Sequence, residues 1–76
     1  MNQRVKVTQC YFEIRRYGNY LRVSAIDPNS GTEAISTGPV KMGEEVLKRA
    51  AHRKLEYILT KKLQKQTEQN RQDWTA

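Results

Sequence analysis

Residues 10–26 alternate between apolar and polar side chains on both sides of a Gly18-Asn19 pair. Glycine and asparagine both adopt the positive φ that a two-residue hairpin turn requires, so this stretch predicts a β-hairpin. The turn places Tyr17 opposite Tyr20, which fixes the register of the two strands. One face of the hairpin then carries the apolar side chains: Cys10, Phe12, Ile14, Leu21, Val23 and Ala25.

A second turn is predicted at residues 27–32, where proline, asparagine, serine and glycine cluster. A third strand should follow at about residues 32–37. Its inward face is open between two assignments, because Ala34 and Ser36 are weak core residues and Ile35 points the other way unless a β-bulge intervenes. Residues 1–9 form either a basic N-terminal segment or an early strand, in which Val5 and Val7 alternate with basic residues but are out of phase with Cys10.

Helical spacing of apolar residues begins after Gly38-Pro39 and predicts one helix over about residues 44–63. Residues 64–76 are polar, and we expect a disordered tail there. The elements together predict an α+β fold, a three-stranded antiparallel β-meander packed by one long C-terminal helix (βββα), with residues 10–63 as its single domain. Phe12 is expected at the centre of the core, where truncation to alanine should cost about 3 to 5 kcal/mol.

The composition of the 76 residues limits the functional classes. Hydrophobic residues make up 37% of the chain. The formal net charge is +6, and this positive charge favours phosphate or an acidic protein surface as the partner. The single cysteine, Cys10, and the single histidine, His52, have no evident partners for catalysis or metal binding. We therefore expect no enzyme activity, cofactor or metal. No stretch is apolar enough for a membrane span or signal peptide, so we expect a cytoplasmic protein.

The polar face of the hairpin and the polar side of the helix are rich in tyrosine, arginine and lysine. Tyrosine rings can stack on unpaired bases, and basic side chains can pair with phosphate, which favours nucleic-acid binding, with RNA ahead of DNA. The candidate binding residues are Tyr11, Arg15, Tyr17, Tyr20, Arg22, Lys48, Arg49, Arg53, Lys61 and Lys62.

Three other interpretations use the same residues. Tyrosine and arginine are good strand formers, and a basic helix face is often only solvated surface. The chain could instead be an accessory module or small subunit that docks on a larger acidic protein. Alternatively, the outer sheet face could close a homodimer that buries Tyr11, Ile26 and Ile35.

Several short motifs together resemble a known family. They are Tyr11-Phe12-Glu13, Gly18-Asn19-Tyr20, Val23-Ser24-Ala25-Ile26-Asp27-Pro28, Gly31-Thr32-Glu33, Gly38-Pro39 and Lys54-Leu55-Glu56-Tyr57. Over about residues 10–60 the chain is similar to a family of short uncharacterised bacterial proteins, some of them labelled serine hydroxymethyltransferase. That enzyme needs several hundred residues, so the label does not fit here. The resemblance implies a compact domain and transfers no functional residue.

Overall fold

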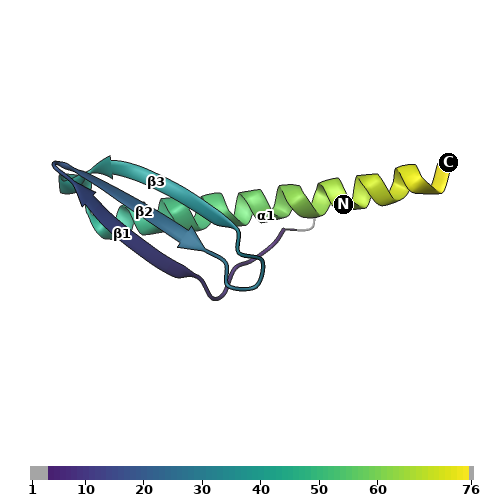
Figure 1. The fold of residues 1–76 in the computed structure, drawn as a ribbon, viewed down its shortest axis with the longest axis horizontal. Coiled ribbons are helices and arrows are strands. Elements are labelled where there is room, and N and C mark those ends of the chain that lie inside the picture. Colours follow the sequence, from purple (N-terminus) through teal and green to yellow (C-terminus); the bar gives the residue numbers. More distant parts are fainter. Residues whose placement is uncertain (1–3, 76) are drawn as a thin grey trace.

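The computed structural model describes the backbone of residues 4–75 and the side chains of residues 4–65. Three antiparallel strands in the order β1-β2-β3 are followed by a short 3-10 helix and one long helix, which confirms the α+β βββα fold (Figure 1). The elements are β1 (Tyr11–Tyr17), β2 (Tyr20–Ile26), β3 (Glu33–Pro39), η1 (Val40–Met42) and α1 (Glu44–Thr75).

The first hairpin has the predicted register. Tyr17 lies opposite Tyr20, and Phe12 lies opposite Ala25. Gly18 has a φ of 59°, in the left-handed region that glycine adopts without a steric penalty. Turn chemistry and strand alternation therefore specify the same pairing.

The third strand settles the question that its sequence left open. Ala25 of β2 pairs with Ala34 and Leu21 pairs with Gly38, so Ala34, Ser36 and Gly38 face inward and Ile35 faces outward. The register is continuous from Glu33 to Pro39. The small inward residues are explained by the helix, because a Cβ added at Gly38 would lie 3.0 Å from Cδ2 of Leu47.

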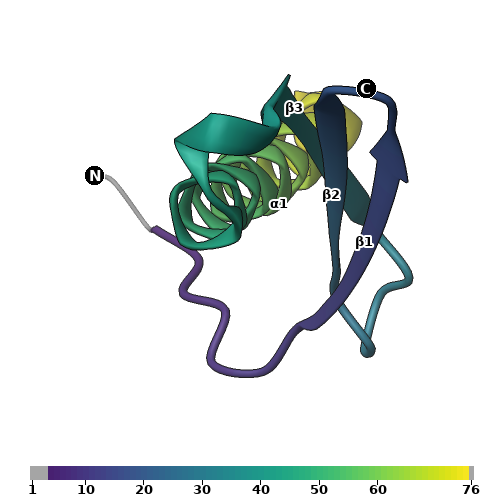
Figure 2. The same ribbon diagram turned by 90° about the vertical axis from the view of Figure 1, so that its left-hand side faces the viewer.

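The helix lies across β2 and β3, and β1 lies farther from it, as the view along the helix in Figure 2 shows. The largest fully buried side chains are Val23, Leu47 and Leu55. Phe12 is 39% exposed, so its expected place at the core centre is wrong. The helix approaches closest where the strand residues are small, and this leaves the edge strand β1 only partly covered. The buried apolar core consists of Leu21, Val23, Ala25, Ala34, Leu47, Ala51 and Leu55.

The C-terminal boundary of the helix differs from the sequence-based prediction. The helix continues to Thr75, and residues 64–75, expected to be disordered, have a helical backbone. Glutamine, lysine, glutamate and arginine are good helix formers, and no glycine or proline follows Gly43 to end the helix. At the other end, residues 4–10 form no strand and instead contact the helix. Residues 1–3 and 76 lie outside the described residues.

Candidate functional site

The outer face of the sheet, opposite the helix, carries the tyrosines and arginines that the sequence singled out. Its paired positions include Tyr17 with Tyr20 and Arg15 with Arg22. The rings of Tyr11, Tyr17 and Tyr20 belong to residues that are 67%, 54% and 60% exposed. The helix covers only the inner face, so these three rings and the two arginines form one open surface, which we call the tyrosine face.

A shallow hollow of about 200 Å³ lies on the tyrosine face. Within it, the Arg15 guanidinium donates to Oε1 of Glu13 at 3.0 Å, and this hydrogen bond raises the pKa of Arg15. Arg22 lies directly opposite Arg15, and like charges in that position repel. Among residues 4–65, Arg22 has no ion pair with an acidic side chain, so it is the cation left to meet an anion. The lining residues are Glu13, Arg15, Tyr17, Arg22, Ser24 and Glu33.

The helix cations lie in the other layer and divide into two groups. Lys48, Arg49 and Arg53 line the space between α1 and β1. Lys61 and Lys62 lie farther along the helix, where the ammonium of Lys61 is 5.6 Å from the Tyr57 ring centroid and that of Lys62 donates to Oγ1 of Thr32 at 3.1 Å. All five belong to the helix, which packs on the other face of the sheet, so the ten predicted residues lie in two layers.

Sequence reasoning missed a groove between β1 and the first turns of α1. It has a volume of about 280 Å³, and Phe12 is its aromatic lining residue. The ammonium of Lys48 lies 5.8 Å from the centroid of the Phe12 ring, within cation–π range, and 3.7 Å from Oε1 of Glu45. No local sequence pattern brings Phe12 next to Lys48, because the contact depends on where the helix crosses the sheet. The groove is lined by Phe12, Glu45, Lys48, Arg49, His52 and Arg53.

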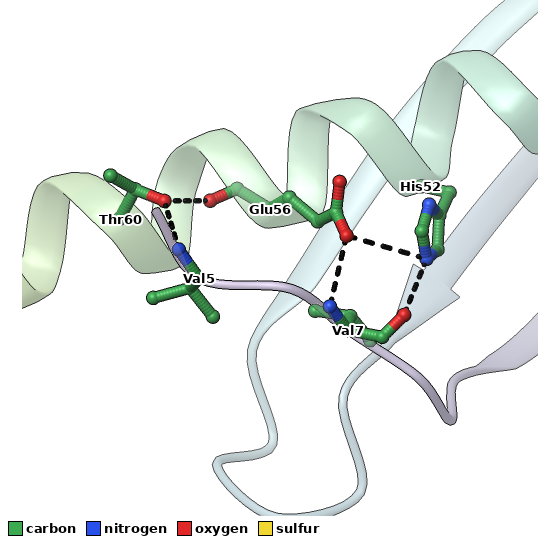
Figure 3. A network of polar contacts seen from close by, with 5 residues as sticks. All are labelled: Val5, Val7, His52, Glu56 and Thr60. Atoms are coloured by element: carbon green, nitrogen blue, oxygen red, sulfur yellow. Dashed lines mark hydrogen bonds and ion pairs between the residues drawn. The ribbon is translucent and has the colours of Figure 1, made fainter. Parts of the chain in front are cut away.

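Polar contacts hold the N-terminal segment against the helix at the end of this groove (Figure 3). The main-chain N–H of Val7 donates to Oε2 of Glu56 at 2.9 Å, and that of Val5 donates to Oγ1 of Thr60 at 3.0 Å. Nε2 of His52 lies 2.8 Å from the carbonyl oxygen of Val7. A carbonyl can only accept, so this nitrogen carries the proton. His52, which appeared to lack a partner in the sequence, therefore anchors the segment.

The remaining reactive group is the thiol of Cys10, which packs partly buried against the core. Burial, together with the nearby charges of Asp27 and Glu56, raises its pKa and so disfavours the nucleophilic thiolate. Within the described part of the chain, no group of three or more histidine, cysteine, aspartate or glutamate side chains could hold a metal ion. In the same part, no helix combines the length and apolar character needed to cross a membrane.

Comparison with protein families identifies the group to which this chain belongs. Residues 7–62 match the family described as Domain of unknown function (DUF6898), and because the match covers most of the chain, the protein belongs to that family. No curated protein and no solved structure matches the chain. The family is thus uncharacterised, as the sequence resemblance implied, and its match begins within the segment that contacts the helix.

Proposed function

We propose that this DUF6898 protein is a binding protein, not an enzyme, and that its tyrosine face holds single-stranded nucleic acid, RNA in preference to DNA. The observation that carries the proposal is the exposure of three tyrosine rings on one uncovered sheet face beside Arg15 and Arg22. Aromatic rings on an open sheet stack on unpaired bases, and arginine adds contacts to phosphate or to base planes. The net charge of +6 favours approach of a polyanion.

The two basic surfaces have different parts in this proposal, because they lie in different layers. A strand lying on the tyrosine face would contact Arg22 and not the helix cations, which lie beyond the sheet. Stacking would therefore supply most of the affinity, with weak dependence on base identity, because every base has a π face. Cytoplasmic residence, where RNA is abundant, belongs to the same proposal.

The test is the binding of a fluorescent oligouridine to single alanine variants at Tyr11, Tyr17 and Tyr20. Each should lose roughly 1 to 3 kcal/mol of binding free energy, the range for base stacking. Tyr57→Ala is the matched control, because Tyr57 is 62% exposed but lies on the helix, and it should bind as the parent does. A DNA oligonucleotide of the same sequence should bind more weakly than the RNA.

Two results would contradict the proposal. Equal losses in Tyr57→Ala and in the sheet variants would mean that binding does not occur on the tyrosine face. Absence of oligouridine binding, with sedimentation showing a dimer that Tyr11→Ala dissociates, would mean that the tyrosine face closes a homodimer instead. Thermal unfolding followed by circular dichroism should first establish that each variant is folded.

A further inference from the structure

Strand β1 is an open edge of the sheet. It is seven residues long, contains neither glycine nor proline, and among residues 4–75 pairs only with β2. A free edge presents unpaired main-chain N–H and C=O groups that another strand can bind. Within residues 4–65 no hydrogen bond from a side chain or another segment reaches the main chain of β1 on its outer edge. The preceding segment does not cover it, because Val5 and Val7 bond to the helix.

The opposite edge of the sheet is different. On β3, the main-chain carbonyl of Ile35 accepts a hydrogen bond of 3.0 Å from the ammonium of Lys54. The strand also ends in Pro39, which has no N–H to offer. The two edges are therefore unequal, and β1 is the one left ready for pairing.

The groove beside β1 has a distinct chemical character. Phe12 supplies an exposed aromatic surface, and Lys48, Arg49 and Arg53 supply three positive charges against the single carboxylate of Glu45. That carboxylate is itself paired with Lys48. A ligand in the groove thus meets one apolar surface surrounded by an excess of positive charge.

We propose that β1 and this groove together bind an extended acidic peptide, which adds to the sheet as a fourth strand. Main-chain hydrogen bonds to the β1 edge would give affinity, and every second side chain of the peptide would point into the layer that contains Phe12. One apolar side chain there covers the Phe12 ring, and an acidic side chain two residues along the peptide, on the same face, pairs with the groove cations. This site is independent of the tyrosine face and does not rest on the RNA proposal.

Charge and hydrogen bonding select the peptide over other occupants. A second copy of this chain would bring another +6 charge, which opposes its approach to a groove that already has an excess of positive charge. A nucleic-acid strand could pair its phosphates with the cations, but it has no peptide ladder to match the strand edge. An acidic peptide satisfies both the edge and the cations.

The first experiment measures affinity by fluorescence polarisation, with a labelled, end-blocked peptide of about seven residues in which threonine alternates with glutamate, valine and glutamate in turn, so that the valine and the glutamates share one face. Phe12→Ala and Arg53→Glu should each weaken binding by at least about tenfold. Lys61→Glu makes the same charge change as Arg53→Glu outside the groove lining and should have a much smaller effect. Arg53 is exposed, so its variant keeps the test valid even if Phe12→Ala unfolds the domain.

The second experiment tests strand addition itself. Successive N–H groups of an extended peptide point to opposite edges, so methylating the nitrogens of the threonines, or those of the valine and the glutamates, blocks one edge only. One of these two methylated peptides should bind like the parent peptide and the other should lose binding. Amide hydrogen exchange in β1 should slow at alternate residues when the peptide is present.

Four results would overturn the proposal. They are no saturable peptide binding up to about 1 mM, equal binding by both methylated peptides, and alternate protection of β1 amides in a peptide-free dimer. The fourth is binding of oligouridine, instead of the peptide, that Arg53→Glu abolishes, which would assign the groove to phosphate. Loss of oligouridine binding in the tyrosine variants alone would leave this proposal intact, so the two proposals can fail separately.

Discussion

Truncation of Leu55 is the most direct test of where the core lies. Leu55 is fully buried between the helix and the sheet, so Leu55→Ala removes its packing contacts and leaves a cavity closed on all sides. Such changes cost about 2 to 5 kcal/mol. A domain of 76 residues has a total stability of roughly 4 to 11 kcal/mol, so this variant should lose a large share of it.

Phe12→Ala is the comparison that makes the test decisive. Phe12 is 39% exposed and borders an open groove, so its truncation forfeits part of its burial and encloses no cavity. The cost should be about 1 to 2 kcal/mol, the buried fraction of a full transfer free energy of about 1.5 to 3 kcal/mol. Phe12→Ala should therefore lower the free energy of unfolding less than Leu55→Ala does, although phenylalanine is the larger side chain.

Urea unfolding followed by circular dichroism measures both free energies. The midpoints should shift with unchanged slopes if each variant affects only the native state. A loss in Phe12→Ala equal to or greater than that in Leu55→Ala would refute the reasoning. It would place Phe12 at the centre of the core, and the helix would then have to lie over β1.

Three further predictions follow from single contacts. Gly38→Ala should lower the free energy of unfolding in urea by about 1 to 3 kcal/mol, because the new Cβ would lie 3.0 Å from Cδ2 of Leu47. The same change should cost less in a Leu47→Ala background, and equal costs in both backgrounds would contradict this explanation. Hydrogen bonds from Ser30 lower the pKa of the Asp27 carboxyl, so the Asp27 carboxylate stabilises the fold above its ordinary pKa of 3.8, and this contribution is lost as the pH falls through the lowered pKa. Asp27→Asn should therefore lose less unfolding free energy than the parent over the same fall in pH. Parallel plots of unfolding free energy against pH for the two proteins would disprove the effect. The rate of Cys10 alkylation by iodoacetamide should rise with pH, with a midpoint above the ordinary thiol pKa of 9.0 in the folded protein and at 9.0 in urea. The same pH profile in both conditions would contradict the raised pKa.

The first hairpin shows how far local information reaches. Gly18-Asn19 favours a two-residue turn, in which Gly18 takes a positive φ, and the alternation on either side reaches the same register, so Tyr17 meets Tyr20 as the pattern predicts. That register puts the tyrosines on one face, and they are exposed because the helix packs on the other. The inward face of the third strand is harder to predict from the sequence, because Ala34 and Ser36 are small. Their inward placement is explained by a helix that approaches the sheet closely.

The sequence by itself determined the βββα order, the hairpin register and the side chains on each face of the first hairpin, because turns and period-two alternation act between near neighbours in the chain. The tertiary structure decided where α1 crosses the sheet. That crossing buries Leu55 instead of Phe12, brings Lys48 to the Phe12 ring and leaves the β1 edge open. Such contacts join residues far apart in the chain, and the packing of whole layers selects them.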